Sequence, residues 1–120
     1  MLLTIAGKEV EVLFGTRFVR ELDKRYTINL NGAEFGFGLN KASFYMSQRS
    51  PVGLADLIEC GTRTSKRFKP TTEQIEAFID EQEDLEDLFM AINEELLESN
   101  ITKKQWAEIA TEMEPQTKED

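Results

Sequence analysis

A run of residues with alternating steps of three and four positions is the feature that most restricts how this chain can fold. The members of the run, all but one of them apolar, are Ile75, Phe78, Gln82, Leu85, Phe89, Ile92 and Leu96. Such steps keep side chains on one face of an α-helix. Four more apolar residues widen this face: Ile79, Leu88, Met90 and Leu97. A face this wide is typical of a helix buried in a core or bundle, rather than of a two-stranded coiled coil.

The start of this helical region is marked by a capping box, in which Thr71 is followed three residues later by Gln74. Asp80 and Glu83 have the spacing of a second helix start. The region 72–98 therefore fits either one long helix or two helices with a break near Asp80.

Charge is distributed unevenly along the chain. Residues 1–70 carry eleven basic and seven acidic side chains, whereas residues 71–120 carry three basic and sixteen acidic ones, for a net charge of −9. This overall acidity argues against nucleic acid as the main partner, because non-specific affinity for phosphates comes from lysine and arginine.

A polar loop over residues 62–70 concentrates basic side chains around Phe68. The basic residues are Arg63, Lys66, Arg67 and Lys69, and the acidic residues that could meet them in a second copy are Glu83, Asp84 and Asp87. Head-to-tail contact between successive copies would neutralise both halves of the chain. We therefore expect a homo-oligomer, held in part by these charges.

The first fourteen residues alternate in the manner of a half-buried β-hairpin. Val10, Val12 and Phe14 fall on one face, and Ala6-Gly7-Lys8 provides the reversal. An amphipathic helix follows, with Thr16 in the position of its N-terminal cap and apolar residues at helical spacing up to Tyr26.

Residues 27–38 contain three glycines and an Asn-Gly pair at Asn31-Gly32. The pair suits the tight turn of a second hairpin. Gly36 and Gly38 equally suit a mobile loop that displays Phe35 and Phe37, because glycine removes side chains that a strand needs for packing. Both interpretations remain open from the sequence.

Three further helices are predicted from capping signals and apolar spacing. One covers residues 39–48, one begins at Ser50-Pro51 and ends at Gly61, and one follows Thr102 and places Trp106 and Met113 on one face. The predicted fold class is α+β and mostly helical, with an N-terminal β-hairpin followed by about five or six helices in a compact bundle. Residues 1–114 form the single domain, and residues 115–120 form a disordered C-terminal tail.

The chain lacks the residues of most catalytic sites. It has no histidine and a single cysteine, Cys60, so a cysteine–histidine or serine–histidine nucleophile is excluded. The carboxylates lack the spacing of a calcium loop, and the glycines lack the Lys-Ser or Lys-Thr pair of a phosphate loop. We expect no enzyme, no cofactor, no metal site and no membrane span, and a soluble intracellular protein.

Several segments taken in order resemble the tail assembly chaperones of siphophages that infect Gram-positive bacteria. They are Gly7-Lys8-Glu9-Val10, residues 14–26, Asn31-Gly32-Ala33-Glu34-Phe35-Gly36-Phe37-Gly38, Pro51-Val52-Gly53-Leu54-Ala55-Asp56-Leu57-Ile58, and the acidic helices with Leu85, Leu88 and Phe89. The resemblance covers nearly the whole chain and implies the short form of such a chaperone.

The resemblance implies a protein that binds the tape measure protein and keeps it soluble until the tail tube polymerises around it. It also implies that a longer frameshift product recruits the tail tube protein. The family acts in the host cell cytoplasm and is absent from the mature virion.

Such a chaperone needs exposed apolar surface for its client. The candidates are Phe35 and Phe37 in the glycine-rich segment, followed by Trp106 and Met113 in the last helix. An alternative function is that of an acidic phage regulatory protein, which would block a basic, nucleic-acid-binding site on a host protein with the carboxylates of residues 73–98.

Overall fold

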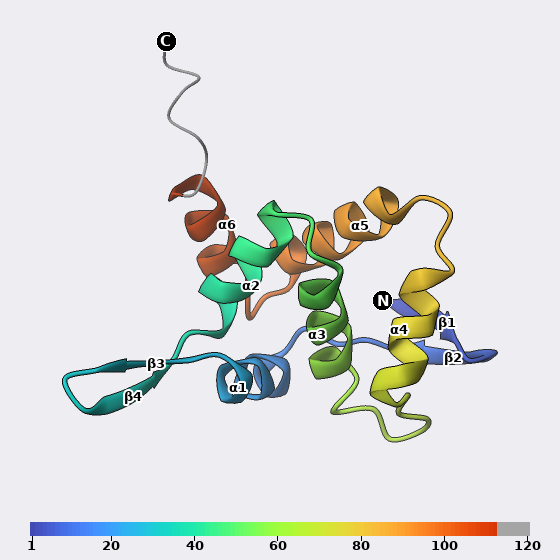
Figure 1. Ribbon diagram of the computed structural model, residues 1–120, viewed down its shortest axis with the longest axis horizontal. Helices are drawn as coiled ribbons and strands as arrows, with labels where there is room; N and C mark the ends of the chain where they lie inside the picture. The colour runs from blue at the N-terminus through green and yellow to red at the C-terminus, as the bar shows by residue number, and fades with distance from the viewer. Residues whose placement is uncertain (113–120) are drawn as a thin grey trace, which may run out of the picture.

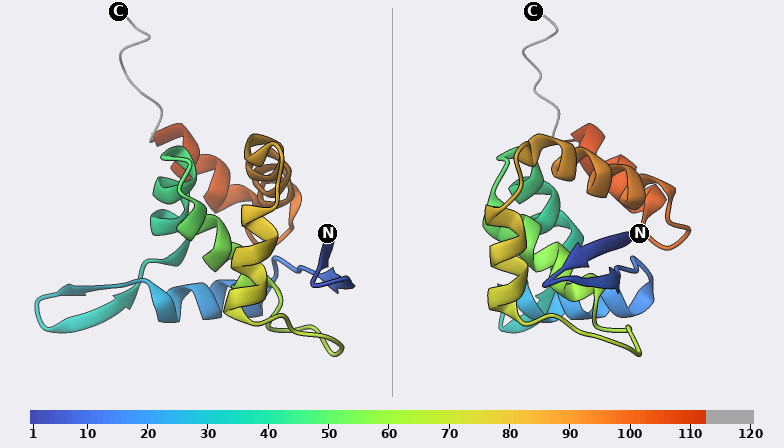
Figure 2. Two further views of the ribbon diagram at one scale, coloured as in Figure 1. Left: turned by 45° about the vertical axis from the view of Figure 1, so that its right-hand side comes forward. Right: turned by 90° about the vertical axis from the view of Figure 1, so that its right-hand side faces the viewer.

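The computed structural model describes residues 1–112, with side chains described up to residue 109. Over these residues the chain forms two antiparallel hairpins and six helices, which confirms the predicted α+β, mostly helical fold (Figure 1). The helices pack around one hydrophobic core, while the second hairpin projects from the helical body (Figures 1 and 2). The predicted tail over residues 115–120 lies outside the described residues.

The N-terminal hairpin consists of β1 (Leu2–Ile5) and β2 (Lys8–Glu11), as predicted. Its reversal uses positive φ angles, 55° at Ala6 and 75° at Gly7. Ile5 and Val10 are buried, and so is Val12, which follows β2. The backbone N–H of Val12 donates to the carbonyl of Met1 at 2.8 Å, so the first residue is held in place.

Helix α1 (Thr16–Arg25) packs Phe18 and Leu22 into the core. Phe14 lies edge-on to Phe18, with ring centroids 4.9 Å apart. The predicted cap at Thr16 is wrong by one residue, because Gly15 is the N-cap and Thr16 is the first helical residue. No side-chain hydrogen bond is made at this cap.

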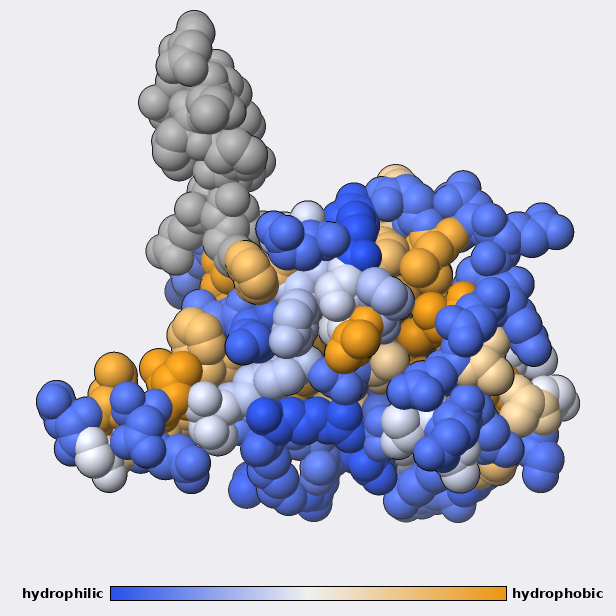
Figure 3. Space-filling view, viewed as in Figure 1, coloured by the Kyte–Doolittle hydropathy of each residue, from blue (hydrophilic) through white to orange (hydrophobic). Residues whose placement is uncertain are grey.

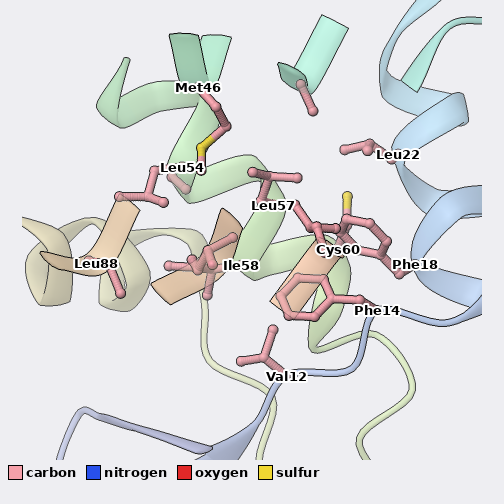
Figure 4. Packing of buried hydrophobic residues seen from close by; sticks show 14 of the residues in the cluster. Val12, Phe14, Phe18, Leu22, Met46, Leu54, Leu57, Ile58, Cys60 and Leu88 are labelled. Atoms are coloured by element: carbon pink, nitrogen blue, oxygen red, sulfur yellow. The ribbon is translucent and has the colours of Figure 1, made fainter. Parts of the chain in front are cut away.

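Helices α2 (Gly38–Ser47) and α3 (Pro51–Gly61) match the predicted segments. Ser50 caps α3 by accepting a hydrogen bond from the N–H of Gly53 at 3.3 Å. Gly53 also lets the two helices meet, since a Cβ there would lie 2.4 Å from Cβ of Tyr45. Helix α3 occupies the centre of the core (Figure 4), and its most buried residues are Leu54, Leu57, Ile58 and Cys60.

The acidic region forms two helices, α4 (Thr72–Asp80) and α5 (Leu85–Glu98), which run in different directions (Figures 1 and 2). The capping box of Thr71 and Gln74 is present in α4. The second cap is Asp84, whose carboxylate accepts from the N–H of Glu86 at 3.1 Å. The predicted cap at Asp80 is therefore wrong, since Asp80 is the last residue of α4.

Helix α6 (Lys103–Glu112) closes the core against α5 and α2. Trp106 and Ile109 point into the core and are 1% and 6% exposed. The hydroxyl of Thr102, just before the helix, donates to the carbonyl of Leu96 at 2.8 Å. The predicted face of this last helix is therefore the face that packs.

Candidate functional site

The hairpin of β3 (Thr27–Leu30) and β4 (Ala33–Gly36) is named the hairpin arm here, residues 27–36. Its two-residue turn is Asn31-Gly32, with φ angles of 53° and 82°. Positive φ at both turn residues matches the right-handed twist of the two strands, and Asn-Gly adopts it readily. Of the two structures that the sequence left open for this segment, the chain forms the hairpin.

Strand pairing gives the arm one apolar face. Residues paired across two antiparallel strands share a face, and neighbours along a strand alternate. The side chains on one face are Ile28, Leu30, Ala33 and Phe35, and the residues on the other are Thr27, Asn29, Glu34 and Gly36. Leu30 is 54% exposed and Phe35 is 51% exposed. Hydrophobic side chains are accordingly visible on the projecting arm (Figure 3).

The base of the arm is fixed to α1 by backbone contacts. The N–H of Phe37 donates to the carbonyl of Tyr26 at 2.7 Å, which closes the hairpin. The N–H of Gly38 donates to the carboxylate of Asp23 at 2.8 Å. A Cβ at either Gly36 or Gly38 would lie 2.6 Å from the Asp23 side chain, so glycine is needed for this close approach.

Tyr26 connects the base of the arm to α3. Its hydroxyl donates to Asp56, and its ring lies edge-on to Tyr45 with centroids 5.8 Å apart. Arg25 holds the same carboxylate of Asp56 at 2.8 Å and reaches Glu59 at 3.1 Å. Burial and the hydrogen bond to Asp56 raise the pKa of the Tyr26 hydroxyl above its ordinary value, so Tyr26 stays a neutral donor.

The structure gives the four predicted partner-binding residues different surroundings. Phe35 is exposed on the apolar face of the arm, whereas Phe37 is half-buried at the start of α2. Trp106 is in the core, where its indole N–H donates to the side-chain oxygen of Asn93 at 2.8 Å, so its ring offers no surface to a partner in this structure. Met113 lies outside the described residues.

The residues that accompany Phe35 on the apolar face were missed as candidates. Ile28 and Leu30 lie on the far side of the Asn31-Gly32 turn, and their pairing with β4 brings them beside Phe35. The signal was present, because apolar residues alternate on both sides of the turn. This alternation identifies Ile28 and Leu30 as neighbours of Phe35 only when the segment forms a hairpin, and not when it forms a mobile loop.

The order and content of the chain match a known family. A family model described as phage tail assembly chaperone protein, TAC, matches residues 2–110. The chain belongs to this family. No curated protein and no solved structure gives a significant match to the tail assembly chaperone. Membership implies interaction with the tail proteins of a bacteriophage, in a family that is not known to be enzymatic.

The thiol of this tail assembly chaperone is buried. Cys60 is 1% exposed in the core, and burial raises its pKa to about 12. A thiol with such a pKa is almost wholly protonated near neutral pH and is a poor nucleophile. Cys60 is therefore a small core residue.

The basic loop of residues 62–70 forms no ion pair with Glu83, Asp84 or Asp87 among the residues that the structure describes. Arg63 forms an ion pair with Glu59, one turn earlier in α3, at 2.9 Å. Within the described part of the chain, the charges of these six residues form no ion pair: Lys66, Arg67, Lys69, Glu83, Asp84 and Asp87. Their predicted role between copies stays a prediction.

A different pair joins the two halves of the chain. Arg49, at the end of α2, forms a bidentate ion pair with Glu86 in α5, with both N–O distances 2.7 Å. The guanidinium also lies over the ring of Phe89. The carboxylates of residues 73–98 are divided between α4, α5 and the connection that joins them, so they do not all lie on one helix.

Proposed function

We propose that this tail assembly chaperone binds the tape measure protein through the apolar face of the hairpin arm and keeps it soluble until the tail tube polymerises. The observation that carries the proposal is the exposure of Leu30 and Phe35 on the same face of an arm that projects from the body. An apolar face without a partner in its own chain is typical of a protein interaction site.

The construction of the arm supports this role. A two-stranded hairpin is marginally stable by itself, but its base is fixed here by Asp23, Tyr26 and Phe37. Both outer strand edges are unpaired within the described residues. Such edges can accept an added strand from a partner. The arm therefore offers a client both apolar side chains and backbone hydrogen-bonding groups.

The charge of the chaperone suits the handling of an apolar client. A net charge of −9 keeps a complex with exposed apolar segments from associating with other complexes. The proposal includes the remaining parts of the expected cycle: release when tube subunits arrive, recruitment of the tube protein by a longer frameshift form, self-association, and action in the host cytoplasm with absence from the virion.

Co-expression with the full-length tape measure protein tests the proposal. The double variant Leu30→Ser with Phe35→Ser removes the two exposed large apolar side chains of the arm without touching the core. We expect the variant to stay folded by circular dichroism while the tape measure protein moves from the soluble to the insoluble fraction.

The matched control changes two exposed apolar residues elsewhere. Met90 and Ile101 are 53% and 52% exposed, and the double variant Met90→Ser with Ile101→Ser should leave the client soluble. A folded arm variant that protects the tape measure protein as well as wild type does would refute the role of the arm.

A further inference from the structure

A second surface lies between α3 and α4. The two helices run antiparallel, since the hydroxyl of Thr72 at the start of α4 donates at 3.1 Å to Glu59 near the end of α3. Between them is a groove of about 370 Å³. Helices α3 and α4 lie side by side in the helical body (Figure 1).

Apolar side chains form part of the groove wall. Val52, in the first turn of α3, is 64% exposed, and behind it Ala55 and Ile79 are 8% and 5% exposed. Val52 is the most exposed large hydrophobic residue among the described side chains. Covering such a side chain is favourable, and the groove between two helices is a common position for a third helix.

One end of the groove already holds a cation from the chain itself. Arg25 reaches across from α1 to Asp56 at 2.8 Å and to Glu59 at 3.1 Å. Its side chain is 29% exposed, and those of the two carboxylates are 21% and 12% exposed. The carboxylates at this end are therefore neutralised internally.

The other end of the groove lacks such a cation. Glu76 and Asp80 line it, are exposed, and form no ion pair with any residue that the structure describes. This is also the C-terminal end of α4, which has no basic residue in its last turn.

We propose that the α3–α4 groove binds an amphipathic helix that carries lysine or arginine beside its apolar stripe. The apolar side chains of the helix cover Val52, and its basic residues pair with Glu76 and Asp80, in the way that Arg25 pairs with the carboxylates at the other end. The nine residues of α4 limit the contact to about three turns of helix. The inference rests on the proposed function, in which the chaperone binds the tape measure protein, and it adds the chemistry of a second contact.

Peptide binding tests the groove apart from the tape measure protein. The probe is a fluorescein-labelled helical peptide of about 14 residues, with leucine along one face, lysine on both flanks and alanine elsewhere. A matched peptide has glutamate in place of lysine. We expect the lysine peptide to bind wild type, and the double variant Glu76→Lys with Asp80→Lys to weaken its binding at least tenfold while improving the binding of the glutamate peptide.

The control variant is Glu94→Lys with Glu98→Lys on α5, which makes the same change in net charge away from the groove. It should change the affinity of the lysine peptide less than threefold. Val52→Ser should weaken the binding of the lysine peptide at least fivefold, because it removes the exposed apolar contact without changing the charge of the groove. Equal losses in the two charge-reversed variants would show non-specific attraction and would overturn the proposal, as would the absence of binding to wild type.

The same variants separate this inference from the proposed function. If the wild-type chaperone keeps the tape measure protein soluble but the groove variants bind the lysine peptide as wild type does, the groove is refuted and the client role stands. If wild type fails to protect the tape measure protein but binds the peptide through the groove, the client role is refuted and the groove stands.

Discussion

The bond from Tyr26 to Asp56 should be a main connection between the base of the hairpin arm and the helical body. A hydrogen bond to a charged acceptor contributes about 1.5–3 kcal/mol when it is shielded from water. Tyr26 is partly buried, so we expect Tyr26→Phe to lower the free energy of unfolding by about 1.5 kcal/mol. Asp56→Ala also removes the pair with Arg25, whose partly exposed side chain adds no more than about 1 kcal/mol.

Together these terms give about 2.5 kcal/mol for Asp56→Ala. Because both single variants remove the same bond, the double variant should cost little more than Asp56→Ala, with a coupling energy of about 1.5 kcal/mol. Urea unfolding followed by circular dichroism and by the fluorescence of Trp106, the single tryptophan, measures all three values. Coincidence of the two probes checks that unfolding is two-state.

A matched control removes the hydroxyl of the neighbouring tyrosine, Tyr45. The ring of Tyr45 packs against Tyr26, and its hydroxyl makes no hydrogen bond among the described residues. Tyr45→Phe should therefore cost less than about 0.5 kcal/mol. A coupling energy below about 0.3 kcal/mol, or equal losses for the two tyrosine variants, would show that the bond to Asp56 does not hold the arm.

Two further predictions concern the core. Gly53→Ala should lower the free energy of unfolding by about 1–3 kcal/mol in a urea titration, because its Cβ would lie 2.4 Å from Cβ of Tyr45 and would push α2 from α3. Gly15→Ala meets nothing within 4 Å, and it should cost only about 0.5 kcal/mol, for the replacement of glycine at the N-cap of α1. The neutral Cys60 thiol should stabilise the fold fully below pH 9, its ordinary pKa, and lose that contribution as the pH rises towards 12. Cys60→Ala should flatten the fall in stability over this range, and an equally steep fall in the variant would contradict the assignment; native Cys60 should also resist thiol reagents at pH 8.

Local signals in the sequence predict much of the fold. The capping box of Thr71 and Gln74, the Ser50-Pro51 start of α3 and the alternation around the first turn each lie within one short segment, and each forms as predicted. Their physical cause is the short distance between a side chain and the free backbone groups of its own segment.

The predictions that failed depend on contacts between distant segments. Apolar spacing correctly places Trp106 on one face of α6, but only the position of α5 determines that this face is buried against Asn93. The break between α4 and α5 is likewise present in the charge pattern, while the choice of Asp84 over Asp80 as cap depends on where the first helix ends.

The hairpin arm separates what the sequence of a segment can predict from what depends on the rest of the fold. Asn31-Gly32 and the flanking alternation are compatible with the hairpin and with the apolar face of Leu30 and Phe35, but Gly36 and Gly38 left a mobile loop open as well. The projection of the arm into solvent depends on Asp23 in α1, which fixes the base through Gly38 and is distant in sequence. The exposure of this apolar face therefore depends on the packed structure and cannot be predicted from the sequence of residues 27–36 alone.

Photo-crosslinking from the arm tests the central claim most directly. The variant Phe35→p-benzoylphenylalanine places a photoreactive group on the apolar face, and Met90→p-benzoylphenylalanine places one on an equally exposed position of α5. After irradiation of cells that also produce the tape measure protein, we predict a covalent adduct with that protein from position 35 and none from position 90. An adduct from position 90 alone, with a folded and photoactive variant at position 35, would contradict the account.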